Sequence, residues 1–131
     1  MLALKLGMSI GGSNRPMGAW KPTDEASVVA WYQNEVGITL NGSDVSAWAD
    51  SANSNDMAQS TASEQPAYSS GSLTFVSADD THLQTTSQIS LTGAFTIGIK
   101  LTPTGSNTGT FLADITTSNE FFKLTSTTNL R

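Results

Sequence analysis

The acidic side chains are the first candidates for chemistry, and two of them are adjacent. Asp79 and Asp80 form the only pair of adjacent aspartates, and a polar stretch at Asn53–Asp56 lies earlier in the chain. Calcium takes about six to eight oxygen ligands, so a site would need the pair together with oxygens from such a loop. The other interpretation is a turn whose carboxylates accept backbone N–H groups. The turn is preferred and calcium is the alternative, so no metal site is assigned.

Residues for acid–base or nucleophilic catalysis do not form a recognisable set. Glycoside hydrolysis needs two carboxylates about 5 to 10 Å apart across a cleft, whereas Glu64 and Glu120 are isolated in the sequence. A serine–histidine–aspartate site would depend on His82, the only histidine, and no Gly-x-Ser-x-Gly elbow supplies a nucleophile. The glycines near the N-terminus lack the spacing of phosphate-binding loops. We therefore predict no enzyme activity, no catalytic residues and no cofactor.

Three tryptophans could stack on sugar rings. Trp31 and Trp48 have apolar neighbours and fall within expected strands, so we predict that both pack in the core. Trp20 belongs to the N-terminal segment, where we expect it to act as an anchor. No glycan-binding residue is assigned from the sequence.

Charge and hydropathy narrow the class of partner. Residues 1–23 carry three basic side chains and no acid, whereas residues 24–131 carry all 11 acids against three basic side chains, a formal charge of −8. No basic side chain lies between Lys21 and Lys100, which argues against a phosphate-binding surface and a nucleic-acid partner. No run approaches the roughly 20 apolar residues of a membrane span. Met1–Ile10 also lacks a signal-peptide pattern, so we expect a soluble, unprocessed chain without a membrane partner.

The first 24 residues are expected to form an extended arm. Leucines at alternate positions have the period of a short strand, and the glycines and prolines that follow prevent regular structure. Such a segment cannot bury its own apolar side chains, so it is either a frayed terminus or a strand that docks on another surface, for example at a sheet edge. In the docked alternative, the anchoring side chains are Leu2, Leu4, Leu6, Met8, Ile10 and Trp20.

Residues 25–131 have the pattern of an all-β sandwich. Short apolar runs are separated by polar, glycine-containing connections. Asn41–Gly42 between apolar flanks predicts a hairpin, and only Asp24–Tyr32 suggests a helical turn. The expected strands lie at 28–32, 38–40, 45–48, 73–76, 83–85, 95–101, 110–115 and 121–125.

Several segments resemble concanavalin A-like, or laminin-G-like, jelly-roll domains, over roughly residues 28 to 101. In chain order they are Ala30-Trp31-Tyr32, Ile38-Thr39-Leu40-Asn41-Gly42-Ser43, Val45-Ser46-Ala47-Trp48-Ala49-Asp50-Ser51, Asn53-Ser54-Asn55-Asp56-Met57-Ala58-Gln59, Gln65-Pro66-Ala67-Tyr68, Asp79-Asp80-Thr81-His82-Leu83 and Leu91-Thr92-Gly93-Ala94-Phe95-Thr96-Ile97. The resemblance implies a jelly-roll β-sandwich with His82 in a strand near the sheet rim, where the family has an aromatic. The family's Phe-Asp-Gly is replaced by Phe75-Val76-Ser77, which removes a carboxylate from a calcium site.

Members of this family have more strands than are expected here. The resemblance therefore implies a sandwich that is incomplete at its C-terminus, where Arg131 follows a strand with no closing partner. Either the native chain continues beyond Arg131, which is the preferred interpretation, or a neighbour completes the sheet. An uncovered sheet edge needs a neighbour. Homo-oligomer formation is accordingly expected.

Such domains occur in bacteriophage virion proteins, and Met1–Gly7 is similar to the opening of marine phage tail and fibre proteins. The resemblance implies a virion structural protein, a tail, fibre or decoration subunit, whose arm binds other virion proteins. Its body would be a structural or glycan-adhesion module that meets a host surface glycan. The alternative is a carbohydrate-binding module of a secreted bacterial adhesin or glycan-processing protein, which would use a loop such as Asn53–Asp56.

Overall fold

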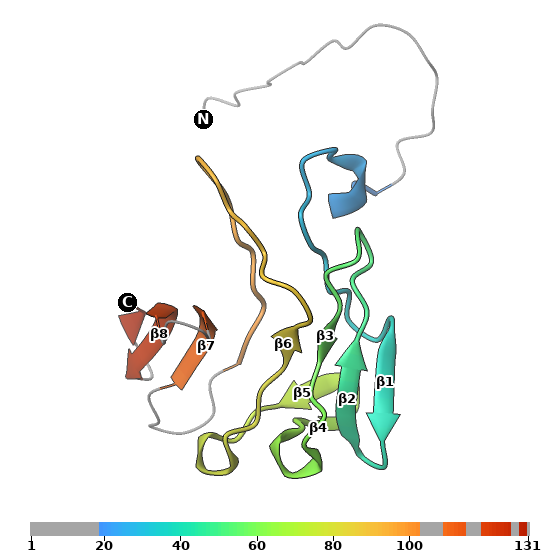
Figure 1. The fold of residues 1–131 in the computed structure, drawn as a ribbon, viewed down its shortest axis with the longest axis vertical. Coiled ribbons are helices and arrows are strands. Elements are labelled where there is room, and N and C mark those ends of the chain that lie inside the picture. Colours follow the sequence, from blue (N-terminus) through green and yellow to red (C-terminus); the bar gives the residue numbers. More distant parts are fainter. Residues whose placement is uncertain (1–18, 103–108, 115–118, 127–128, 131) are drawn as a thin grey trace, which may run out of the picture.

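The structure is a computed structural model that describes residues 19–102, 109–114, 119–126 and 129–130. These residues form antiparallel strands in two sheets, with only short 3-10 turns as helical elements (Figure 1). The chain is therefore of the all-β class, as its sequence predicts. No helix within the described ranges is long and apolar enough to cross a membrane.

The larger sheet is built around the second strand, β2. Its order is β5-β4-β2-β3-β6, and β1 pairs with β2 outside this path. Because a strand has two edges, β1 lies along one edge of β2 while β4 and β3 share the other. The strands are β1 (Ile38–Asn41), β2 (Asp44–Trp48), β3 (Met57–Ala58), β4 (Ala67–Ser69), β5 (Ser72–Thr74) and β6 (Gln84–Thr85).

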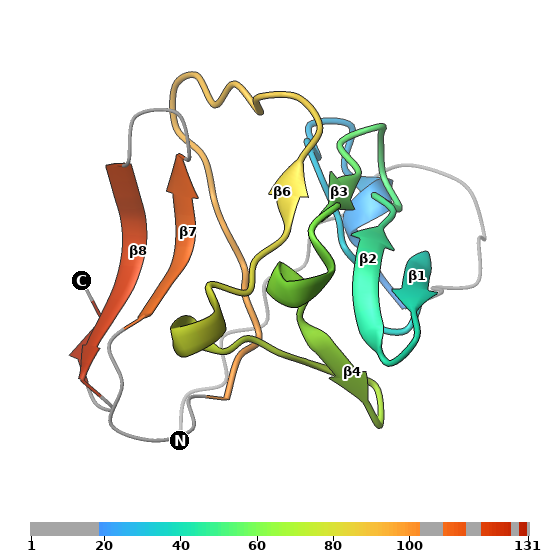
Figure 2. The ribbon, with the colours of Figure 1, turned by 60° about the horizontal axis from the view of Figure 1, so that its bottom comes forward.

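The smaller sheet follows later in the chain and is antiparallel as well. It contains β7 (Gly109–Asp114), β8 (Asn119–Ser126) and β9 (Asn129–Leu130) in that order. The two sheets lie on opposite sides of residues 86–102, the gold-to-orange segment, in both views (Figure 2). Three 3-10 turns complete the described elements: η1 (Pro22–Asp24), η2 (Ala62–Glu64) and η3 (Ser77–Asp79).

Two tight hairpins set the register of the larger sheet. Asn41 pairs with Asp44, so the loop between β1 and β2 is Gly42 and Ser43, one residue later than Asn41–Gly42. Of these two loop residues, only Gly42 has a positive φ, of 67°. This is the pattern of a type II′ turn, which has glycine at its first central position. The β4–β5 loop has positive φ at both Ser70 and Gly71, the pattern of a type I′ turn.

The centre of the larger sheet is small and largely polar. Val45 in β2 is the only fully buried large apolar side chain among the described residues, next to buried Pro66. Asp50, Gln59 and Gln65 are also buried, and every buried side-chain nitrogen or oxygen atom in the described part has a hydrogen-bond partner. Burial of a polar group without a hydrogen bond is costly. The stability of this sheet therefore depends on keeping these buried polar side chains paired.

Most of the expected strands are confirmed. The strands expected at 38–40, 45–48 and 110–115 correspond to β1, β2 and β7, and β8 covers 121–125; Ile115 lies outside the described residues. The strand expected at 83–85 is β6. The strand expected at 73–76 ends earlier, at Thr74, because η3 begins at Ser77.

Two expected strands are wrong. Residues 28–32 belong to no strand ladder, because side chains of a later loop and the Ser51 N–H bond their backbone in place of a neighbouring strand. Residues 95–101 have the alternation of a strand but no strand partner among the described residues. The helical turn suggested at Asp24–Tyr32 is limited to η1 and the bend after it.

Candidate functional site

The loop that follows β2, residues 50–56, is held by one buried carboxylate. Oδ1 of Asp50 accepts hydrogen bonds from the backbone N–H groups of Trp31 and Ala52, both at 2.8 Å, and Oδ2 accepts one from Asn55 at 3.2 Å. The N–H of Asp50 itself donates to Oδ1 of Asp56 at 2.8 Å. Because both oxygens of Asp50 face backbone donors, this carboxylate is a structural centre rather than a free base or metal ligand.

Two opposing effects act on the pKa of Asp50. Burial raises it, but hydrogen bonds from the backbone of Trp31, Ala52, Asn55 and Asn53 outweigh burial, so the pKa lies below its ordinary value. The carboxylate is therefore ionised at neutral pH.

The phenol of Tyr32 shares this site. Burial, followed by the negative charges of Asp50 and Asp56, raises the pKa of Tyr32 to about 12. The phenol therefore stays protonated at neutral pH and donates to the carbonyl oxygen of Asn55. Tyr32 thus closes the 50–56 loop as a donor, and it does not act as a base.

Two asparagine amides fasten the loop to the segment before β1. Nδ2 of Asn53 donates to the carbonyl oxygens of Val28 and Val29 at 2.8 and 2.9 Å, and Nδ2 of Asn55 donates to Val29 at 2.8 Å. These bonds replace the backbone ladder expected at residues 28–32. They also occupy the amide donors that a glycan-binding loop would offer to sugar hydroxyls.

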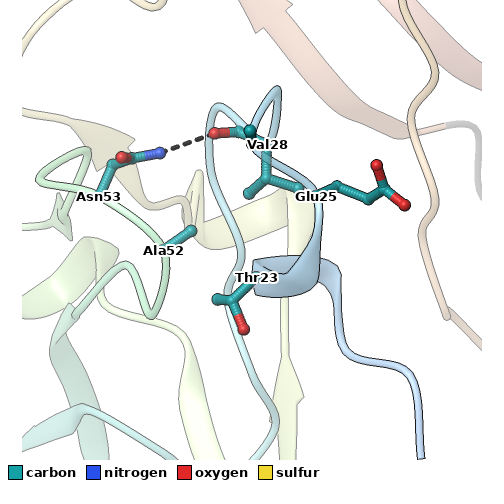
Figure 3. A pocket seen from close by; sticks show the side chains of 6 residues that line it. Thr23, Glu25, Val28, Ala52 and Asn53 are labelled. Atoms are coloured by element: carbon teal, nitrogen blue, oxygen red, sulfur yellow. Dashed lines mark hydrogen bonds between the residues drawn. The ribbon is translucent and has the colours of Figure 1, made fainter. Parts of the chain in front are cut away.

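A hollow of about 210 Å³ lies between this loop and the segment before β1. Its lining comes from Thr23, Glu25, Ala26, Val28, Ala52 and Asn53. In Figure 3 the Asn53 amide reaches the Val28 carbonyl, while the Glu25 carboxylate points away from Ala52 and Asn53. No aromatic ring lines the hollow, so it lacks the stacking platform that sugar-binding sites commonly use.

A second polar cluster joins β3 to the segment before β6. Nε2 of the buried Gln59 lies 3.1 Å from Oε2 of Glu64 and 2.9 Å from Nε2 of His82. Nδ1 of His82 lies 2.8 Å from the Asp80 carbonyl oxygen. The tautomer that satisfies both contacts carries its proton on Nδ1, which donates to Asp80, and accepts from Gln59 at Nε2. His82 is half-buried just before β6, outside any strand, and has a structural hydrogen-bonding role.

The same cluster continues through a second buried glutamine. Nε2 of Gln65 donates to the Gln59 carbonyl oxygen at 2.7 Å, and Oε1 of Gln65 accepts from Asn41 at 3.0 Å. Oε1 of Gln59 accepts the N–H of Thr61 at 2.9 Å. These bonds tie the β1–β2 hairpin to η2 and β3.

The acidic pair lies in a turn, as preferred from the sequence. Asp79 ends η3, and Asp80 follows with a left-handed φ of 51°. The turn is closed by Thr81, whose Oγ1 accepts the Val76 N–H at 2.5 Å, and not by the two carboxylates. Both acidic residues are exposed, and no three metal-ligating side chains gather in the described ranges.

The structure separates the three tryptophans. Nε1 of Trp48 donates to the carbonyl oxygens of Gln33 and Val36, both at 3.1 Å, and its ring lies 5.7 Å from that of Tyr32 at 57°. Trp31 is half-buried, whereas Trp20 is 66% exposed. Trp20 is the only predicted anchoring residue in the described part. The others, Leu2, Leu4, Leu6, Met8 and Ile10, lie outside the described residues.

The side chains with the most hydrogen bonds, Asp50, Gln59 and Gln65, are not among the candidate site residues that the sequence indicates. Asp50 carries a usable signal, because an aspartate that follows a strand and precedes a small-residue loop favours a side-chain bond to the N–H two residues on. The two glutamines carry none, since glutamine is mostly exposed in proteins. No family model, curated protein or solved structure matches the chain.

Proposed function

We propose that this chain is a bacteriophage virion structural protein, a tail, fibre or decoration subunit that an N-terminal arm attaches to the particle. The body, residues 25–131, would be a concanavalin A-like jelly-roll sandwich, and the antiparallel all-β arrangement supports this. The proposal extends to a homo-oligomer located in the virion, with other virion proteins as partners. It assigns the body a structural or glycan-adhesion role.

The contrast between arm and body is the observation that carries the proposal. Residues 1–23 are basic and rich in apolar side chains, while residues 24–131 have a formal charge of −8. Where the chain enters the described region, Ala19, Trp20 and Lys21 are all exposed. An indole that is 66% exposed next to an apolar segment is typical of a residue that becomes buried against a partner.

The alternative is a carbohydrate-binding module of a secreted bacterial protein. The amides of Asn53 and Asn55 are committed to backbone carbonyls, which leaves the 50–56 loop few free donors for a sugar. The attachment role is therefore the better supported. A glycan array on the full chain discriminates the two, because binding that is lost with Ser54→Ala would favour the carbohydrate-binding module.

Removal of the arm tests the attachment role. A chain lacking residues 2–18 should fail to sediment with assembled particles while its circular dichroism remains that of a β protein. Leu4→Asp should weaken sedimentation more than Ala3→Asp. Both substitutions add one negative charge, but position 4 belongs to the alternating leucines, whereas position 3 belongs to the opposite face. Undiminished sedimentation of the shortened chain would refute the attachment role.

A further inference from the structure

A long segment between the two sheets has a backbone that makes no hydrogen bond within the described part of the chain. From Ser87 to Thr102, no backbone N–H or carbonyl group makes a hydrogen bond with another described residue; the last such bond runs from the Thr86 N–H to the Asp56 carbonyl. In both views this segment passes between β6 and β7 without joining either strand (Figures 1 and 2). Exposed extended backbone of this kind is a template for strand addition.

The side chains of this segment have the alternation of a half-buried strand. Phe95, Ile99 and Leu101 are 56%, 49% and 41% exposed, and Ile97 is half-buried. They occupy every second position, whereas Thr96, Gly98 and Lys100 occupy the positions between them. In an extended chain the first set shares one face, so residues 95–101 combine an apolar face with backbone groups that no other described residue bonds.

We propose that residues 2–6 of a second copy's arm add as a strand to residues 95–101. The inference rests on the proposed role of the arm in attachment and names its partner as a neighbouring copy of this chain. Leu2, Leu4 and Leu6 repeat at the period of Phe95, Ile97, Ile99 and Leu101, so leucines on one strand meet apolar side chains on the other.

Charge favours the arm as the occupant. The arm contains three basic side chains and no acid, and the rest of the chain has a formal charge of −8. A second body approaching the same segment would bring this negative charge against itself. An incoming arm is attracted to the body as a whole, which raises its rate of association at low ionic strength. The only charged side chain within residues 95–101 is Lys100, so this attraction steers the arm and adds nothing to the contact itself.

The exit direction of the arm is compatible with a second copy, and since residues 7–18 span about 40 Å when extended, the trapping experiment has to separate a second copy from the chain's own arm. In both views residues 19–21 leave η1 on the side that faces away from residues 95–102 (Figures 1 and 2). Trp20 is 66% exposed at this exit, so the described start of the chain does not pack back onto its own body. Exchange of a terminal strand between copies is a common route to symmetric assembly.

Disulfide trapping tests the contact, because the chain has no native cysteine. Full-length Leu4→Cys chain is mixed with full-length chain of different mass that carries Ile97→Cys, Ile99→Cys or Leu101→Cys, and mixed dimers are measured on non-reducing gels. Lys100→Cys on the opposite face and Ser54→Cys on a distant loop are the matched controls. At least one apolar-face pair should form dimers about tenfold faster than both controls, because disulfide formation requires close β-carbons.

Three outcomes would overturn the inference. They are equal rates for all pairs, faster trapping at Lys100→Cys than at every apolar-face position, and a bridge within a single Leu4→Cys/Ile99→Cys chain at high dilution without mixed dimers. Loss of particle sedimentation on arm removal without preferential trapping would leave the attachment role standing and reject this contact. Preferential trapping with undiminished sedimentation would support this contact and reject the attachment role.

Discussion

The Oδ1 atom of Asp50 accepts the backbone N–H of Trp31 at 2.8 Å and so joins the segment before β1 to the loop after β2. The N–H groups of Ala52 and Asn55 in the same loop also bond this carboxylate. A charged acceptor in a buried position makes stronger bonds than a neutral one, and the loss of either partner leaves the other unpaired. Asp50 therefore replaces the strand ladder that residues 28–32 lack.

Asp50→Asn should destabilise the fold by about 2–4 kcal/mol in urea unfolding. The substitution removes the charge and directs an amide donor at a backbone N–H. Asp79→Asn is the matched control; Asp79 is exposed, so its substitution should change stability by less than about 0.5 kcal/mol. Equal effects of the two substitutions would exclude a structural role for Asp50.

The contribution of Asp50 should depend on pH in one direction. Its folded-state pKa lies below the unfolded value of about 3.9, so the unfolded chain takes up the proton first as pH falls. The stabilisation is complete above about pH 5 and is lost as pH falls through the lowered folded pKa. The difference in unfolding free energy between wild type and Asp50→Asn should therefore shrink between pH 7 and pH 3. A constant difference would contradict this assignment.

Gly37→Ala should be much more destabilising than Gly42→Ala. Both glycines have positive φ, 72° and 67°, which costs an L-residue about 1–2 kcal/mol. A Cβ at Gly37 would also lie 2.8 Å from Cβ of Ala49, whereas a Cβ at Gly42 meets nothing within 4 Å. The clash should add about 1–3 kcal/mol at Gly37 alone. Thermal unfolding of the two variants measures the difference, and equal losses would show that Gly37 and Ala49 are not in close approach.

Gln59→Met should cost about 1–3 kcal/mol. Gln59 is 5% exposed, and its removal leaves the Thr61 N–H and the Glu64 carboxylate without their partner. Methionine has a length similar to that of glutamine, so the loss of unfolding free energy comes from the missing hydrogen bonds more than from a change in side-chain volume. The control is Gln88→Met at an exposed position, where the change should be within about 0.5 kcal/mol. A neutral Gln59→Met would contradict the buried network.

Trp48→Phe should destabilise the chain by about 1–2 kcal/mol, because the carbonyls of Gln33 and Val36 lose a shared donor. Trp20→Phe should leave unfolding unchanged, since Trp20 is exposed. Acrylamide quenching separates the two, because removal of Trp20 should eliminate the most accessible emission. Retention of that emission in Trp20→Phe would place another tryptophan at the surface.

The sequence is a good guide where local signals agree with pairing. Alternation and Gly42 together predict β1 and β2, although the turn is one residue later than Asn41–Gly42. Residues 28–32 could not be predicted correctly, because their partners belong to a later loop and not to a strand. These partners are the side chains of Asp50, Asn53 and Asn55 and the backbone N–H of Ser51. Residues 95–101 show the limit of local reasoning, since alternation reports a tendency to pair and says nothing of what the partner is.

Hydrogen exchange of the full chain, alone and assembled in particles, tests most directly the claim that one copy's arm pairs with another copy's body. Backbone amides of residues 95–101 should exchange rapidly in the isolated chain, because no described residue bonds them. On assembly, slow exchange should appear together at residues 2–6 and 95–101. Particles in which the amides of residues 95–101 exchange as rapidly as in the isolated chain would contradict the account.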